Sequence, residues 1–136
     1  MNIYFIGAIR GGRIHQPQYS EIVSGLKKYG TVLSAQVADE TISDYGETNL
    51  TKEEIHDREL ELLKTSDVVV AEVTVPSLGV GYLIAQALNL NKRVCCLYWG
   101  ENTYKLSAMI KGNKMAKVYL YRNRLELADV LQKIFN

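Results

Sequence analysis

The segment from Asp67 to Val73 constrains the fold more than any other part of this chain. It reads Asp-Val-Val-Val-Ala-Glu-Val, so apolar side chains follow one another instead of alternating with polar ones. Such a strand is buried on both of its faces, which is typical of parallel sheets covered by helices on both sides. We therefore predict that residues 67–73 form the central strand of a parallel sheet.

Segments of two kinds alternate along the whole chain. Short apolar runs predict strands, whereas helical periodicity and capping signals predict helices. The expected strands are residues 3–8, 31–34, 67–73, 93–99 and 117–121, and the expected helices are residues 17–29, 51–66, 78–89, 104–111 and 124–135. Residues 38–49 have no period, and we expect a mobile loop there. This order predicts one α/β domain, residues 1–136, with a five-stranded parallel sheet flanked by helices.

Charge and composition exclude several classes of partner. With 16 basic and 15 acidic side chains the net charge is +1, so no basic face attracts polymeric nucleic acid or an anionic membrane. No apolar stretch approaches the roughly 20 residues that a membrane span needs. Met1 leads into the first strand without a signal-peptide pattern, and Cys95 and Cys96 read as buried structural thiols. We expect a soluble, cytoplasmic protein.

Two loops at the predicted carboxyl edge of the sheet carry the residues best suited to bind an anion. Ligands of open parallel sheets bind beyond the carboxyl ends of the strands, where helix N-termini point their amides. The first loop contains Gly7, Arg10, Gly11 and Arg13, and its guanidinium groups suit phosphate or carboxylate. A solvated basic turn is the alternative interpretation of this loop.

The second loop follows the central strand and contains Ser77, Gly79 and Gly81. A hydroxyl and two glycines allow the backbone to approach a phosphate before a helix begins. An ordinary strand-to-helix turn with an N-cap serine is the alternative here. Two such loops over one edge make a shared anion site more probable than either does alone.

Several well-known sites are absent from the sequence. Gly79-Val-Gly lacks the third glycine of a dinucleotide fingerprint, and no P-loop or Gly-x-Ser-x-Gly elbow occurs. His15 and His56 lie far apart, and no metal-ligand spacing is present, so we expect no metal site.

Three segments together resemble a known family. Residues 4–13, 67–82 and 106–112 resemble the 2'-deoxynucleoside 5'-phosphate N-hydrolases of the nucleoside 2-deoxyribosyltransferase superfamily, in the same order and with similar spacing. The resemblance implies a Rossmann-like fold, a homodimer, a nucleoside 5'-monophosphate or sugar phosphate as ligand, and no cofactor. The implied reaction releases the free base and a sugar 5-phosphate.

The resemblance also implies residue roles. Arg10, Gly11, Ser77 and Gly79 would contact the 5'-phosphate, and Tyr4 would lie beside the sugar. Ser107 would reach the phosphate in the partner subunit's site. In the family a glutamate attacks the anomeric carbon, and a nearby aspartate orients groups or moves protons.

Four positions depart from the family pattern. The nucleophilic glutamate corresponds to Leu83 and the aspartate to Glu59, while a serine corresponds to Ala8 and a histidine to Gln36. Leucine cannot supply the carboxylate that displacement at an anomeric carbon needs.

These departures leave two main functions open. In the first, the chain remains an N-glycosidase, and Glu59, or Glu40 or Glu47 of the loop, has taken over the catalytic role of the missing glutamate. In the second, it is a catalytically silent relative that binds nucleotides as a sensor or regulatory subunit. Glu72, inside the central strand, is a weaker candidate with a structural role, and a different reaction on a related ligand is the third alternative.

Overall fold

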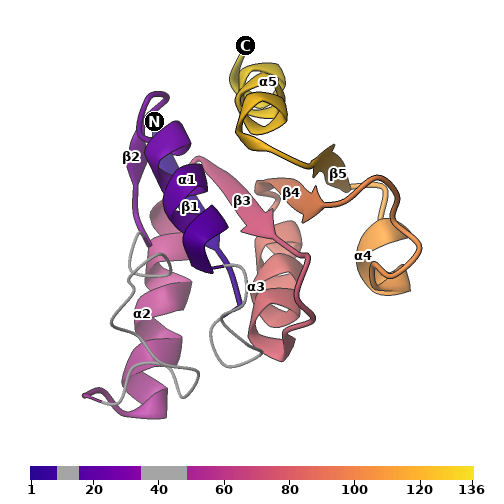
Figure 1. Cartoon of the computed structure of the whole chain (residues 1–136). Helices are drawn as coiled ribbons and strands as arrows, with labels where there is room; N and C mark the ends of the chain where they lie inside the picture. The colour runs from indigo at the N-terminus through magenta and orange to yellow at the C-terminus, as the bar shows by residue number, and fades with distance from the viewer. Residues whose placement is uncertain (9–15, 35–48) are drawn as a thin grey trace.

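One sheet of five strands runs through the described part of the chain, and each pair of neighbouring strands is parallel. The structure is a computed structural model that describes residues 1–8, 16–34 and 49–136 (Figure 1). The strands are β1 (Asn2–Ile6), β2 (Thr31–Val32), β3 (Val68–Glu72), β4 (Arg93–Trp99) and β5 (Ala116–Tyr121). Their spatial order is β2-β1-β3-β4-β5, so β3 is central. The predicted α/β class and parallel sheet are confirmed.

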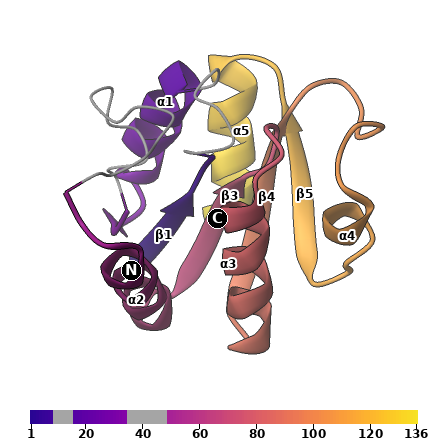
Figure 2. The same ribbon diagram turned by 90° about the horizontal axis from the view of Figure 1, so that it is seen from below.

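Helices cover both faces of this sheet (Figure 2). Helices α1 (Gln16–Leu26) and α5 (Arg124–Phe135) pack on one face, and α2 (Lys52–Thr65) and α3 (Leu78–Asn89) pack on the other. The short α4 (Ala108–Lys111) lies beside β5. Each face has its own apolar core, with Cys95 in the core under α1 and α5 and Cys96 in the opposite core. Both thiols are buried and unpaired, as predicted.

Local signals in the sequence explain where several elements begin and end. The Thr51 hydroxyl accepts the Glu54 amide at 3.1 Å while the Glu54 carboxylate accepts the Thr51 amide at 3.3 Å, which is the predicted capping box of α2. The predicted bounds of α3, β4 and α5 are confirmed to the residue.

Other bounds differ from the predicted ones. The first strand ends at Ile6 and not at position 8, and β2 covers only two residues. Helix α1 ends at Leu26, because the amides of Lys28 and Tyr29 bond three residues back and tighten the chain into a turn. The loop prediction for residues 38–49 falls almost entirely outside the described residues.

The helix predicted from residue 104 begins four residues later. Ser107 is not helical, with φ −48° and ψ 130°, and its hydroxyl accepts the Met109 amide at 3.3 Å, so it caps α4. Leu106 therefore precedes the helix and is buried in the core of its own chain, and Ile110 packs against that core. Met109, by contrast, points outward, with 82% of its surface exposed.

Candidate functional site

The carboxyl edge of the sheet gathers the predicted site residues that the structure describes. Because all five strands are parallel, β1, β3, β4 and β5 end at this edge, and the segments that follow them meet there. Gly7 and Ala8 follow β1, and the Ala8 amide donates to the Tyr19 hydroxyl of α1 at 3.1 Å. Arg10, Gly11 and Arg13 lie outside the described residues.

Ser77 caps the helix that follows the central strand. Its hydroxyl oxygen accepts the Val80 amide at 3.2 Å, and its carbonyl accepts the Gly81 amide at 3.1 Å. The hydroxyl is an acceptor in this bond, so its own proton can be donated to a ligand oxygen. Among the described residues, a Cβ on Gly79 would meet nothing nearer than 3.9 Å, and one on Gly81 would meet nothing within 4 Å. The part of the chain that the structure describes therefore leaves open space around the glycines in the first turn of α3.

Tyr4 and Glu59 are brought together although 55 residues separate them. The buried Tyr4 hydroxyl donates to Glu59 Oε2 at 2.5 Å, and Arg58 Nη2 donates to Glu59 Oε1 at 2.7 Å. Only 16% of the Glu59 side chain is exposed. Burial, and then the negative charge of Glu59, raises the pKa of Tyr4 well above its usual range, so Tyr4 stays a proton donor. Each Glu59 oxygen already accepts a hydrogen bond from a fixed partner.

Leu83 lies in the first part of α3, directly after Tyr82. Its half-buried side chain packs against the apolar cluster to which Tyr4, Ile6 and Ile84 belong. Leu83, which the family resemblance matches to the nucleophile, thus packs against the apolar cluster on the face of the sheet that carries Tyr4.

His56 is a polar residue of this region that sequence reasoning missed. Its Nε2 lies 2.9 Å from the Tyr82 hydroxyl, and its Nδ1 lies 2.9 Å from Asp57 Oδ1. His56 sits one turn before Glu59 on α2, and Tyr82 directly precedes Leu83 on α3. The bond therefore joins the two helices beside the candidate site. The three-residue spacing from Glu59 was the only signal for it, because its partner is on another helix.

A cleft of about 670 Å³ separates α3 from α4 on the same face. Ser77 and Ser107, the caps of the two helices, both line it. Most other lining side chains are apolar, among them Val73, Pro76, Leu78, Leu106, Met109 and Ile110. Within one chain, Ser107 therefore faces the cleft that Ser77 faces.

Glu72 is a buried carboxylate at the end of β3, with 1% of its surface exposed. Its Oε1 accepts the Thr74 amide at 2.6 Å, and its Oε2 accepts the Tyr121 hydroxyl. A group held inside the protein in this way is poorly placed to attack a ligand at the surface.

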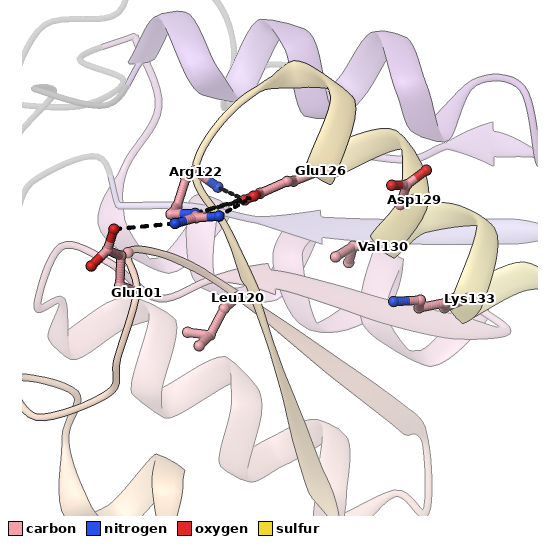
Figure 3. Close-up of a pocket in the computed structure, with 8 residues that line it drawn as sticks. Glu101, Leu120, Arg122, Glu126, Asp129, Val130 and Lys133 are labelled. Carbon is pink, nitrogen blue, oxygen red and sulfur yellow. Dashed lines mark hydrogen bonds and ion pairs between the residues drawn. The ribbon is translucent and has the colours of Figure 1, made fainter.

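A second hollow, of about 420 Å³, lies between the end of β5 and α5 (Figure 3). Arg122 forms ion pairs there with Glu101 at 3.1 Å and Glu126 at 2.6 Å. Hydrogen bonds from Arg122 hold the pKa of Glu126 below its usual range. The arginine is thus neutralised by two carboxylates, which makes this hollow a poor anion site.

Within residues 1–8, 16–34 and 49–136, no three His, Cys, Asp or Glu side chains gather as metal ligands would. No helix in the same ranges is long and apolar enough to cross a membrane.

The chain is similar to nucleotide N-hydrolases over nearly its whole length. A family model described as nucleoside 2-deoxyribosyltransferase matches residues 3–123. The 5-hydroxymethyl-dUMP N-hydrolase of Danio rerio is 43% identical over 137 residues, which cover 99% of this chain and 96% of that protein. The enzyme of the same name from Mus musculus is 49% identical over 112 residues, 82% of this chain and 65% of that protein. The resemblance to N-glycosidases of nucleoside 5'-monophosphates is confirmed.

A solved structure shares the fold. The CMP N-glycosidase of Clostridium botulinum superposes with a TM-score of 0.68, covering 98% of this chain and 99% of that chain. At 16% sequence identity, this similarity concerns the fold alone.

Proposed function

This chain belongs to the nucleoside 2-deoxyribosyltransferase family, and from that membership we propose that it binds a nucleoside 5'-monophosphate but releases the base very slowly or not at all. The phosphate would lie at the carboxyl edge of the sheet, between the loop after β1 and the N-terminus of α3. The sugar would face Tyr4, Glu59 and Leu83.

The open first turn of α3 carries the binding part of this proposal. The Ser77 hydroxyl can donate a proton, and no described residue of the chain crowds Gly79 or Gly81. Gly7, Arg10, Gly11 and Arg13 would complete the phosphate contacts from the other loop. A helix N-terminus favours an anion through its amides and its dipole, and arginine adds charge-assisted hydrogen bonds.

The bonding of Glu59 supports the catalytic part. A nucleophile needs an oxygen that can approach the anomeric carbon, whereas both Glu59 oxygens accept hydrogen bonds, from Tyr4 and Arg58. Leu83, at the position of the family glutamate, has no oxygen to offer and packs into the apolar cluster.

An N-glycosidase that uses Glu59 is the second candidate function. It is favoured by one observation, the position of this little-exposed carboxylate at 2.5 Å from the Tyr4 hydroxyl that the family likeness assigns to the sugar. A substrate would then have to displace Tyr4 or Arg58 from Glu59.

The assembly and the location of the protein also belong to the proposal. We expect a homodimer in which Ser107 reaches the neighbouring phosphate, supported by the large exposed apolar side chains Leu78, Tyr104 and Met109 near the cleft between α3 and α4. We expect a cytoplasmic location, which suits two free buried cysteines, and no cofactor. Sedimentation that shows a monomer at micromolar concentration would contradict both the proposed dimer interface and the proposed contact of Ser107 with the neighbouring phosphate.

Calorimetry with matched ligands tests the proposal. A panel of deoxynucleoside 5'-monophosphates, including 5-hydroxymethyl-dUMP, would be titrated beside the corresponding nucleosides, and each mixture would be analysed for free base. We expect at least about tenfold tighter binding of the monophosphates, because charge-assisted hydrogen bonds are each worth roughly 1.5–3 kcal/mol. Equal affinities for a monophosphate and its nucleoside would contradict the proposal.

A further inference from the structure

The loop that leads from β3 to Ser77 is attached to the neighbouring strand β4 at its first residues. The Thr74 hydroxyl accepts the Trp99 amide from the end of β4 at 2.8 Å, and the Val73 amide donates to the Leu97 carbonyl at 2.9 Å. The Thr74 amide in turn donates to Glu72 Oε1 at 2.6 Å. The loop therefore starts from a fixed point at the carboxyl edge.

Glu72 extends this attachment to β5. Its Oε2 accepts the hydroxyl of Tyr121, the last residue of that strand, which lies 49 positions further along the chain. Burial, and then the negative charge of Glu72, raises the pKa of Tyr121 well above its usual range, so the hydroxyl keeps its proton and donates it. One carboxylate thus links the loop amide to the far strand of the sheet.

Joining strands through a buried carboxylate costs free energy, although backbone hydrogen bonds already pair β3, β4 and β5. Burying a charge costs free energy unless charge-assisted hydrogen bonds compensate for it, and an apolar side chain would pack there without that cost. The register of β3, β4 and β5 is set by the ladder itself. Besides its bond to the Tyr121 hydroxyl, Glu72 supplies a bond that the ladder lacks, to the Thr74 amide beyond the end of β3.

The distance along the chain from this bond to the candidate phosphate site is short. Only Val75 and Pro76 separate Thr74 from Ser77, and proline fixes its own φ angle and restricts the residue before it. A shift of Thr74 is therefore transmitted to Ser77 and to the amides of the first turn of α3.

We propose that Glu72, Thr74 and Tyr121 form a brace that positions the Ser77 loop for a phosphate, so that Glu72 is a positioning residue and neither a nucleophile nor a proton donor. The inference rests on the proposed function, because it concerns the same phosphate site. It predicts that loosening the brace weakens recognition of the phosphate and leaves recognition of the sugar and base intact.

Two substitutions loosen the brace from opposite ends. Tyr121→Phe removes only the hydroxyl that binds Glu72, and Thr74→Val removes only the hydroxyl that accepts the Trp99 amide, at nearly constant volume. Tyr119→Phe is the matched control, because Tyr119 lies two residues earlier in β5 and packs on the same core as Tyr121. Thr74→Ser is the rescue variant, since it restores the hydroxyl.

The readout is the ratio of two calorimetric Kd values, for 5-hydroxymethyl-dUMP and for 5-hydroxymethyl-2'-deoxyuridine, with thermal unfolding as the test of folding. We expect Tyr121→Phe and Thr74→Val to weaken monophosphate binding by about tenfold and nucleoside binding by less than about twofold. Tyr119→Phe and Thr74→Ser should keep the parental ratio. If Tyr121→Phe does not fold, Thr74→Val decides alone, since it removes only the bond between the loop and the Trp99 amide.

An unchanged ratio in a folded Thr74→Val protein would overturn the inference while leaving the proposed function intact. A parallel loss of both affinities would also overturn it, because a merely structural role predicts that pattern. If the parent protein itself binds the two ligands equally, the proposed function fails and the brace has no phosphate to position.

Discussion

The two sides of the candidate site differ in what their polar groups are engaged with. On the phosphate side, Glu72 and Thr74 hold the loop from within, and the first turn of α3 is open to a ligand. On the sugar side, Glu59 is engaged with Tyr4 and Arg58, and Leu83 contributes an apolar wall. In the proposed function, recognition and catalysis depend on different residues of one edge, so one can be kept while the other is lost.

The largest expected effect is on the sugar side, where restoring the missing carboxylate should raise the rate of base release. Leu83→Glu should raise base release from deoxynucleoside monophosphates on the order of 100-fold or more, about 2.7 kcal/mol of barrier, because it returns an attacking oxygen to the sugar. Leu83→Gln is the matched control, since it has nearly the same shape and no carboxylate. Chromatographic detection of free base measures the rate for both variants. An equal rise in the two would contradict the claim that a carboxylate nucleophile is missing at position 83.

Removing a charge from the phosphate side should affect binding alone. Arg10→Ala is expected to weaken monophosphate binding by about tenfold and to leave nucleoside binding nearly unchanged, as if the phosphate itself had been removed. Arg124→Ala is a suitable control, because this exposed arginine pairs with Glu21 on the outer surface of α5. Calorimetry that finds the same Kd for Arg10→Ala and the parent would take Arg10 out of the site.

Cys95 and Cys96 belong to neither side of the candidate site, so replacing them should change only the stability of the protein. Burial raises the pKa of Cys96 to about 12, so the unreactive thiol predominates at neutral pH, and labelling should be slow until the protein unfolds. The double Cys95→Ala, Cys96→Ala variant should lose about 1–3 kcal/mol of unfolding free energy through packing defects and keep its monophosphate affinity. Rapid labelling of either thiol in the native protein would contradict this prediction.

The smallest expected effect comes from Glu59. Glu59→Gln keeps an oxygen that can accept the hydrogen bond from the Tyr4 hydroxyl. The rate of base release should therefore be nearly the same in this variant as in the parent protein. Glu61→Gln, on the exposed surface of the same helix, is the control. If the parent turns over at ordinary enzyme rates and Glu59→Gln abolishes turnover, the second candidate function is correct and the site has been rebuilt around Glu59.

The elements that sequence reasoning predicted best are those with strong local signals. The unbroken apolar run at residues 68–71 identified the central strand, and the Thr51–Glu54 capping box identified the start of α2. The predicted start of α4 at residue 104 was wrong, because the Ser107 side chain caps the helix, which therefore begins at Ala108. A four-residue helix has too few turns for periodicity to define its end.

The site itself was predictable only in part. Ser77 follows from its place after the central strand, and the pairing of Tyr4 with Glu59 is consistent with the roles that the family likeness implied. The bonds of Glu72 to Tyr121 and of His56 to Tyr82 join positions 49 and 26 residues apart. Such pairs depend on which elements meet in three dimensions, and no local pattern of residues encodes that.

The most direct measurement of the central claim is to follow one bound ligand over time. The parent protein, in excess over 5-hydroxymethyl-dUMP, would be incubated and sampled by chromatography, with calorimetry confirming that the ligand is bound. The account predicts saturable binding with the nucleotide recovered intact, because the proposed phosphate contacts are mostly kept and position 83 has no carboxylate to attack the sugar. Release of free base and a sugar 5-phosphate within seconds, near the roughly 10 s⁻¹ of a typical enzyme, would contradict it.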